Sequence, residues 1–124
     1  MLKSIGLDLV EVDRIRADLD KYGERFAHRV LGADEQRIFD RRRDRPLFLA
    51  GRFAAKEAVI KALGHYLADR PPLSHLQILN DDTGQPVLRL PQYLKDKMSG
   101  VRCMISITHD RNYAASVAVF VEEK

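Results

Sequence analysis

The charged side chains of Glu57 and Lys61 lie in the mostly apolar segment from Phe53 to Gly64. At 100° per residue they share one stripe of a helix with Ala50 and Ala54. Small neighbours let another molecule approach the helix backbone, and a carboxylate one turn from an ammonium group could hold a metal ion beside a phosphate. The alternative is structural, because Glu followed four residues later by Lys is also a favourable helix ion pair, worth roughly 0.2 to 0.5 kcal/mol.

A second carboxylate, Asp8, lies near the end of the segment from Ser4 to Leu9, in which polar and apolar residues alternate. The alternation predicts a strand with one buried apolar face, and Asp8 falls on the opposite face. Mg²⁺ is commonly held by one or two carboxylates together with waters and substrate phosphates, so Asp8 and Glu57 beside Lys61 would suit a phosphate ester or a pyrophosphate. Alternatively, Asp8 caps the helix predicted to start near Glu11.

The elements that must position these residues follow from periodicity and from turn and cap residues. Gly64 can end the long helix that carries Glu57, and Asp34 can cap a shorter helix before it. The order of a strand, then helices, then hairpins predicts one α+β domain over residues 1–124, with helices packed on one mostly antiparallel sheet. The expected strands span residues 4–9, 76–79, 87–90, 101–108 and 113–121, and the expected helices span residues 11–19, 24–30, 34–41, 46–63 and 91–98.

The composition is that of an ordinary globular chain, with 124 residues of which 45% are hydrophobic and 31% charged. The net charge is +3, and arginines gather in the first half, so a polyanionic partner is expected. The lone Cys103 excludes an internal disulfide, and neither a secretory leader nor an apolar run of roughly 20 residues is present, so we expect a cytoplasmic protein. The sequence also lacks zinc-site spacing, a glycine-rich phosphate loop and a nucleophile elbow.

Three separated blocks of this sequence, Ile5 to Ile15, Arg52 to Gly64 and Ser106 to Ala114, together resemble those of a known family, the holo-[acyl carrier protein] synthases, which are small 4'-phosphopantetheinyl transferases. The first block, Ile5 to Ile15, resembles the opening of the family. The second runs from Arg52 to Gly64 and resembles its signature helix, and the third, Ser106 to Ala114, resembles its closing hairpin. The resemblance extends from Gly6 nearly to the end of the chain and implies the α+β fold of that family.

The resemblance implies an enzyme that transfers the 4'-phosphopantetheine group of coenzyme A to a serine of apo acyl carrier protein, in support of fatty acid biosynthesis. The other product is 3',5'-ADP. The resemblance also implies that Asp8 and Glu57 bind Mg²⁺, that Lys61 contacts the pyrophosphate of coenzyme A, and that His109 lies near the bound nucleotide. Asp8, Glu57 and Lys61 are therefore the expected catalytic residues.

Similar proteins are trimers whose sites lie between neighbouring subunits, so the resemblance also implies a homotrimer. In such a trimer the hairpin loop from Gly84 to Pro86 would complete the adenine pocket of an adjacent subunit. Arg14, with Lys21 and Arg25 nearby, resembles the basic surface that receives the acidic helix of acyl carrier protein.

Phosphoryl transfer relies on positioning and charge neutralisation more than on covalent participation by the protein, so Lys61 is expected to offset charge on the departing 3',5'-ADP. The base that deprotonates the serine stays open between Glu57, acting directly or through a metal-bound water, and Glu35. Two rival functions also stay open. One is a Mg²⁺-dependent hydrolase of nucleotides or phosphate esters that uses the same residues, and the other is a nucleic-acid-binding module built on Arg41 to Arg45.

Overall fold

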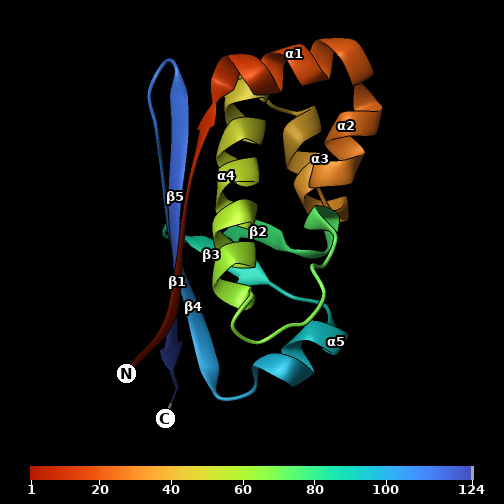
Figure 1. Ribbon diagram of the computed structural model, residues 1–124. Coiled ribbons are helices and arrows are strands. Elements are labelled where there is room, and N and C mark those ends of the chain that lie inside the picture. Colours follow the sequence, from red (N-terminus) through yellow and green to blue (C-terminus); the bar gives the residue numbers. More distant parts are fainter. Residues whose placement is uncertain (124) are drawn as a thin grey trace.

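The computed structural model describes residues 1–123. Its framework is a three-stranded antiparallel sheet with one long helix, α4, packed against it (Figure 1). The strand order is β1-β5-β4, so the first strand of the chain pairs with the last. These elements span Leu2–Glu11 for β1, Arg45–Leu63 for α4, Val101–His109 for β4 and Tyr113–Glu122 for β5.

Most of the remaining elements lie on the side of α4 away from the sheet (Figure 1). Three helices pack around the N-terminal half of α4, and a two-stranded hairpin, β2-β3, lies beside β4. The helices are α1 (Val12–Tyr22), α2 (Glu24–Val30), α3 (Ala33–Asp40) and α5 (Gln92–Lys95), the 3-10 helices are η1 (Leu73–His75) and η2 (Asp96–Met98), and the hairpin strands are β2 (Gln77–Asn80) and β3 (Pro86–Arg89).

The predicted α+β class is confirmed. The strands form two antiparallel sheets, because the β2-β3 hairpin does not join the ladder of the larger sheet. Over residues 1–123, none of the helices combines the length and the apolar character needed to span a membrane.

β1 approaches α4 closely because small residues meet at the contact. A Cβ added at Gly6 would come within 1.9 Å of the Ala58 carbonyl oxygen, so no larger residue fits there without a shift of the backbone. On the helix, Ala54, Ala58 and Ala62 are at most 1% exposed. This close packing holds the backbone of β1 against α4 and brings the residue after Leu7 next to the helix.

The apolar side chains of β1 face away from α4, which corrects the expectation that they are buried. Ile5, Leu7 and Leu9 are 59%, 65% and 64% exposed, whereas Gly6 and Asp8 face the helix. The alternation correctly places Asp8 opposite the apolar set, but in the single chain that set covers the outer face of the sheet.

A buried ion pair joins α4 to α3. The Lys56 ammonium and the Glu35 carboxylate are fully buried and lie 2.5 Å apart. Burial lowers the pKa of the Lys56 ammonium, and the charge of Glu35 opposes this shift. Four backbone groups complete the network, namely the carbonyls of Val30 and Leu73, which accept from Lys56, and the amides of Gly32 and Ile78, which donate to Glu35. The network ties four elements and η1 together.

The N-terminus of α3 differs from the prediction. Asp34 lies inside the first turn, and Gly32 is the N-cap residue. The Gly32 amide donates to the Glu35 carboxylate at 2.9 Å, and the Asp34 amide donates to the Gln77 side chain at 2.9 Å. A residue from β2, distant in sequence, therefore replaces the local cap that Asp34 was expected to provide.

The cysteine of the chain, Cys103, is half-buried on β4. Burial raises the pKa of its thiol to about 12. The thiolate is the nucleophilic form of cysteine, so a thiol that stays protonated at neutral pH is unsuited to covalent catalysis.

Candidate active site

Asp8 and Lys61 are in direct contact at the junction of β1 and α4. The Lys61 ammonium lies 3.2 Å from an Asp8 carboxylate oxygen and donates to the Leu7 carbonyl at 2.8 Å. The Asp8 side chain is only 16% exposed, whereas the Lys61 side chain is 55% exposed. The N-terminus of α1 has no side-chain cap, so the alternative in which Asp8 caps that helix is wrong.

Glu57, one turn before Lys61, pairs with a residue that the sequence did not single out. Its carboxylate lies 2.5 Å from the guanidinium of Arg70, in the loop between α4 and η1. The Glu57 side chain is 17% exposed and the Arg70 side chain 58%. Within the described residues, Glu57 and Lys61 thus each pair with another segment rather than with each other, so the simple helix ion pair is wrong.

The donor set at this junction fits a small divalent cation. Asp8 and Glu57 offer carboxylate oxygens, the ligands that Mg²⁺ prefers, and both are largely shielded from solvent. Among residues 1–123, no group of three or more His, Cys, Asp or Glu side chains could hold a metal ion. A metal ion bound by this pair would therefore take its other ligands from water and substrate. We call Asp8, Glu57, Lys61 and Arg70 the carboxylate site.

Glu35 is removed from the candidates for a catalytic base. Its carboxylate is fully buried, and both of its oxygens already accept hydrogen bonds, from Lys56 and from backbone amides. A substrate hydroxyl has no route to it. Glu57 is the carboxylate that remains at the surface of the site.

A second polar cavity, of about 150 Å³, lies beside His109 at the β4 edge of the sheet. The Arg52 side chain, from a residue only 7% exposed, stacks on the Phe48 ring at 4.7 Å and donates to Asn80 at 3.5 Å. Its buried Nε has no partner among the described residues. Burial lowers the pKa of the Arg52 guanidinium, but an arginine keeps its charge in proteins. A fixed, under-bonded cation of this kind suits a phosphate group.

The mouth of this cavity carries a further arginine. Arg42 and Asp44 form a bidentate pair with two contacts of 2.7 Å. The hydrogen bond from Arg42 lowers the pKa of the Asp44 carboxyl. We call Arg42, Arg52, Asn80 and His109 the arginine cavity.

Gly84 and Pro86 lie in the β2-β3 hairpin next to the arginine cavity. Pro86 pairs with Asn80, which lines that cavity. Gly84 has a φ of 85°, in the left-handed region that favours glycine. The turn is fixed by the Asp81 carboxylate, which accepts from the Thr83 and Gln85 amides.

The carboxylate site and the arginine cavity lie at opposite edges of the sheet. Asp8 is on β1 and His109 is on β4, and β5 runs between these two strands. Within one chain the structure therefore brings Asp8 into contact with Lys61, one turn after Glu57 on α4, and places His109, Gly84 and Pro86 toward the other edge of the sheet.

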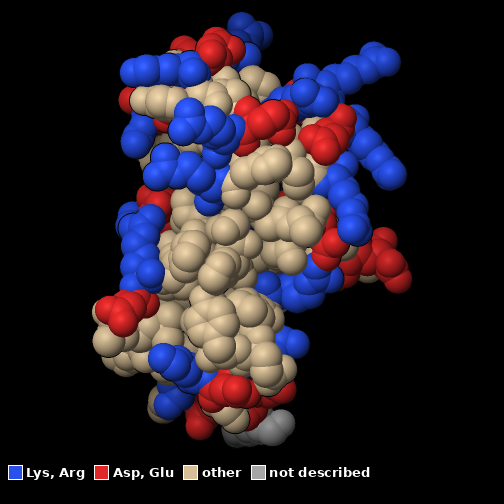
Figure 2. Space-filling model, turned by 90° about the vertical axis from the view of Figure 1, so that its right-hand side faces the viewer, with Lys and Arg blue, Asp and Glu red and all other residues tan. Residues whose placement is uncertain are grey.

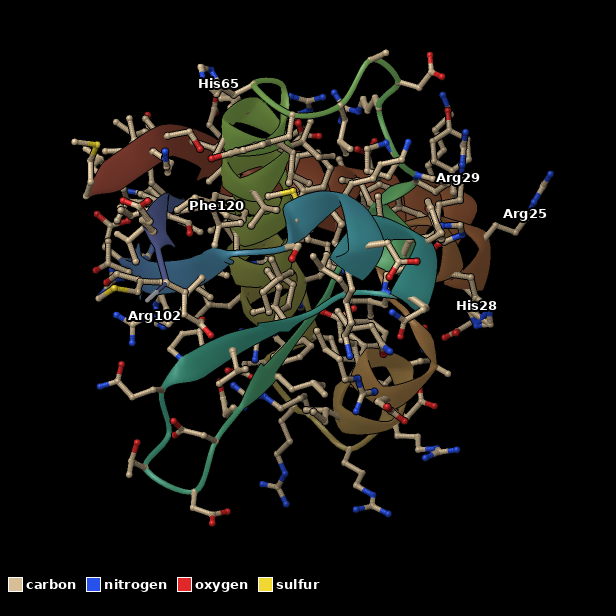
Figure 3. The ribbon with its side chains drawn as sticks, turned by 90° about the horizontal axis from the view of Figure 1, so that it is seen from below. Arg25, His28, Arg29, His65, Arg102 and Phe120 are labelled. Atoms are coloured by element: carbon tan, nitrogen blue, oxygen red, sulfur yellow. The ribbon has the colours of Figure 1, made fainter. Side chains whose placement is uncertain are left out.

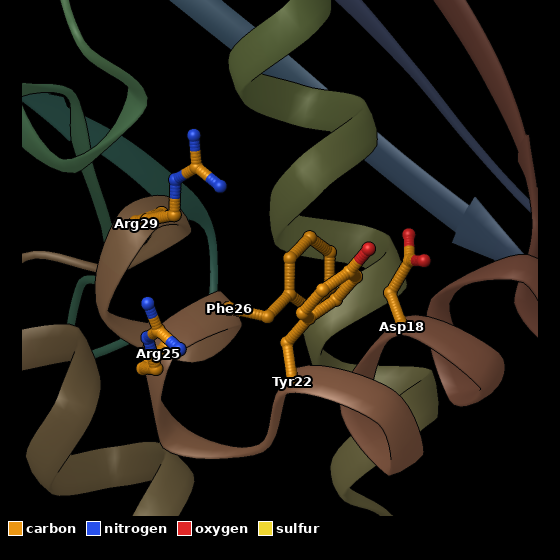
Figure 4. Close-up of a pocket in the computed structure, with 5 residues that line it drawn as sticks. All are labelled: Asp18, Tyr22, Arg25, Phe26 and Arg29. Carbon is orange, nitrogen blue, oxygen red and sulfur yellow. The ribbon is translucent and has the colours of Figure 1, made fainter.

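A third feature is a cavity of about 590 Å³ between α1 and α2 (Figure 4). The rings of Tyr22 and Phe26 lie together at its centre, with arginines on one side and an acidic residue on the other. Its lining residues are Asp18, Tyr22, Arg25, Phe26 and Arg29. The cavity thus combines an apolar floor with a mainly basic rim.

The three residues predicted to bind a carrier protein are exposed at this end of the molecule. Arg14 and Lys21, two turns apart, share one face of α1, and Arg25 follows on α2. Lys and Arg side chains are abundant over the end of the molecule that carries these helices (Figure 2). Seen from below, Arg25, His28 and Arg29 lie on the side of the molecule away from the sheet (Figure 3).

Sequence reasoning missed Arg70 and the two aromatic residues of the α1–α2 cavity. Tyr22 and Phe26 are four residues apart, a spacing that could have suggested a shared face had α1 and α2 been one helix. Arg70 precedes Pro71 and Pro72, which predicts an extended segment but not the residue that Arg70 meets.

Comparison with known proteins identifies the family. Residues 4–118 match the model of the 4'-phosphopantetheinyl transferase superfamily. The holo-[acyl-carrier-protein] synthase of Protochlamydia amoebophila is 41% identical over 120 residues, covering 97% of this chain and 98% of that protein.

Solved structures agree with this match. The holo-[acyl-carrier-protein] synthase of Neisseria meningitidis has a TM-score of 0.89 at 29% identity, covering 98% of this chain and 100% of that one. A holo-(acyl-carrier-protein) synthase of Bacillus anthracis, in complex with CoA (3',5'-ADP), has a TM-score of 0.80 at 31% identity, covering 100% of this chain and 99% of that one. These matches confirm the resemblance seen in the sequence, and the chain belongs to the 4'-phosphopantetheinyl transferase superfamily.

Proposed function

We propose that this chain transfers the 4'-phosphopantetheine group of coenzyme A to a serine of apo acyl carrier protein and releases 3',5'-ADP. The observation that carries the proposal is the contact of Asp8 with Lys61 at the β1–α4 junction, one turn from the largely shielded carboxylate of Glu57. It occurs in a chain that is 41% identical to a holo-[acyl-carrier-protein] synthase over nearly its full length. The product would serve fatty acid biosynthesis in the cytoplasm. A single reduced cysteine is consistent with that compartment, where thiols are kept reduced.

Asp8 and Glu57 would hold Mg²⁺ in this enzyme. When bound, the ion supplies positive charge beside the phosphate oxygens of the substrate. The proposal is supported by the two largely shielded carboxylates and by the cations that neutralise them in the structure.

Two residues of the chain act in the transfer. Lys61 neutralises charge that builds on the departing 3',5'-ADP. Glu57 accepts the proton of the carrier serine as its oxygen bonds to the β-phosphorus of coenzyme A. The bond from that phosphorus to the oxygen it shares with the α-phosphate breaks at the same time, and the electron pair leaves with the nucleotide.

We further propose a homotrimer in which the carboxylate site of one subunit faces the arginine cavity of the next. The position of the two sites at opposite edges of the sheet supports this arrangement, because in a ring of subunits one edge of a chain can meet the opposite edge of the next. Arg52 and His109 would hold a phosphate of the nucleotide, and Gly84 and Pro86 would lie beside the adenine. The exposed apolar face of β1 supports the association.

Leu7→Asp is expected to convert the assembly to single chains and to abolish transfer. The substitution places a carboxylate on an apolar face that the trimer would bury. The buried charge would have no partner. Light scattering measures the mass of the particle. Tyr93→Asp, on α5 at the opposite side of the molecule, is the matched control and should stay assembled. A Leu7→Asp protein that keeps the mass of the wild type would contradict the role of this face.

The α1–α2 surface would receive the carrier protein. Arg14, Lys21 and Arg25 supply positive charge for an acidic helix, and the cavity floored by Tyr22 and Phe26 supplies an apolar contact. Charge complementarity of this kind raises the rate of encounter and selects the partner.

Arg14→Glu should raise the KM for carrier protein several-fold and leave the KM for coenzyme A nearly unchanged, because the new charge repels only the acidic partner. Steady-state rates with each substrate varied in turn measure both constants. Lys97→Glu, on η2, makes the same charge change away from this surface and should change neither constant. Equal effects of Arg14→Glu on both KM values would rule out this docking surface.

Release of 3',5'-ADP from coenzyme A, measured with and without apo carrier protein, tests the proposed reaction. A transferase releases the nucleotide only when the carrier is present. Release without the carrier would instead identify a hydrolase. The nucleic-acid alternative is weakened because Arg42 already pairs with Asp44 and Arg45 donates to the Asp40 carbonyl.

A further inference from the structure

The contact between Arg70 and Glu57 has no role in the reaction as proposed so far. Arg70 lies in the loop of residues 64–72, which connects α4 to η1. The connection itself does not require Arg70 to contact Glu57. The next residue, Pro71, is buried, and a residue before proline is restricted to extended conformations. The backbone at Arg70 is therefore held in place, while its side chain, 58% exposed, is free to turn.

The charges of the carboxylate site are balanced in pairs. Lys61 neutralises Asp8, and Arg70 neutralises Glu57. A divalent cation that binds both carboxylates competes with both side chains for them. The pyrophosphate of coenzyme A is a diester with one negative charge on each phosphate, so the two displaced cations find two new anionic partners in the arriving substrate.

Arginine suits this second partner better than a lysine would. A guanidinium presents a planar fork that matches two oxygens of one phosphate, and such bidentate contacts are among the stronger hydrogen bonds in proteins. Because Glu57 and Lys61 are one turn apart on α4, a guanidinium that leaves Glu57 is already beside the phosphate that Lys61 would contact.

We propose that Arg70 is a second phosphate-binding residue of the carboxylate site, which exchanges Glu57 for the pyrophosphate of coenzyme A when the divalent cation binds. This inference rests on the proposed function, because it takes coenzyme A and a divalent cation as ligands of the site. It predicts opposite effects on the two ligands when the Arg70 charge is removed.

Arg70→Met should bind Mn²⁺ about two- to fivefold more tightly than the wild type in the absence of coenzyme A, because the exposed guanidinium no longer competes for Glu57. The same variant should bind coenzyme A about tenfold or more weakly in the presence of Mg²⁺, because a charged hydrogen-bond donor to phosphate is lost. Electron paramagnetic resonance of free Mn²⁺ measures the first affinity, and titration calorimetry measures the second.

Lys97→Met removes an equal charge from an exposed residue on η2 and should change neither affinity. Arg70→Lys keeps the charge without the fork and should restore metal binding to the wild-type value and coenzyme A binding only in part. If Arg70→Met lowers the melting temperature, the affinities of Arg70→Lys are compared with those of the wild type instead. Unchanged affinities in Arg70→Met would show an ordinary surface pair, and a change in only one affinity would rule out the exchange.

The outcomes separate this inference from the proposed function. A wild-type protein that binds coenzyme A but leaves the carrier protein unmodified would refute the transferase and leave the exchange by Arg70 standing. A wild-type transferase whose Arg70→Met variant binds both ligands normally would refute the exchange alone.

Discussion

Replacing Glu57 by alanine should lower phosphopantetheine transfer at least about a thousandfold, the scale expected when a catalytic base is removed, and leave the chain folded. Glu57 is proposed to serve both as a metal ligand and as the acceptor of the serine proton. Its side chain contacts an exposed arginine rather than the hydrophobic core. Asp8→Ala should lose transfer in the same way, because the pair would no longer hold the cation. Steady-state rates and circular dichroism measure the two properties.

Asp96→Ala is the control for these variants, since it removes an exposed carboxylate on η2 whose recorded contact is with Gln92. It should transfer at the wild-type rate. Glu57→Gln keeps a hydrogen-bond partner for Arg70 but loses the charge, and should be as inactive as Glu57→Ala. Turnover near the wild-type rate in either Glu57 variant would remove this residue from the site.

Lys56→Met should lower the free energy of unfolding by about 3–5 kcal/mol, the cost of leaving one member of a buried ion pair without its partner. In this variant the Glu35 carboxylate keeps its backbone amides but loses the ammonium, in an interior closed to solvent. Urea denaturation followed by circular dichroism measures the change. The destabilisation should be the largest of the substitutions considered for this chain.

A double variant separates the missing partner from the altered packing. Glu35→Gln combined with Lys56→Met removes both charges, so a large part of the loss should be recovered. A loss below about 1 kcal/mol for Lys56→Met, the range of exposed pairs, would mean that water reaches this network.

Much of the fold follows from local sequence signals. The interval Glu24–Val30 was predicted with the bounds that α2 has, and the long helix ends at Gly64 as expected. These elements carry strong periodicity or punctuation by glycine and proline. The N-terminal cap of α3 was predicted wrongly. The side chain of Gln77, on β2, accepts the hydrogen bond from the Asp34 amide, and a local sequence pattern does not reveal a partner so distant in the chain.

Part of the carboxylate site could also be predicted from local sequence signals. Glu57 and Lys61 are charges within a mostly apolar helix, and Asp8 is the carboxylate near the end of an alternating strand, so their positions could be recognised in the sequence. Arg70 sits in a polar loop, where an arginine is unremarkable, and only the folded chain brings it to Glu57. The role of Arg52 was open in the sequence because its stacking on Phe48 and its contact with Asn80 depend on tertiary packing.

The outer face of β1 shows a limit of pattern reading. Alternation reveals that one face of a strand is apolar, but it does not reveal whether that face is covered by the same chain or by another. Gly6 determines which face of β1 packs on α4, because only a residue without a side chain lets β1 lie against the backbone of that helix. The apolar residues were left on the opposite side, where they support the proposed trimer.

The mass of apo acyl carrier protein after incubation with this protein, coenzyme A and Mg²⁺ tests the central claim most directly. We predict that the carrier gains one phosphopantetheine group on a single serine, and that this gain is absent when the Glu57→Ala variant replaces the wild type. An unchanged carrier mass, with coenzyme A either intact or cleaved, would contradict it.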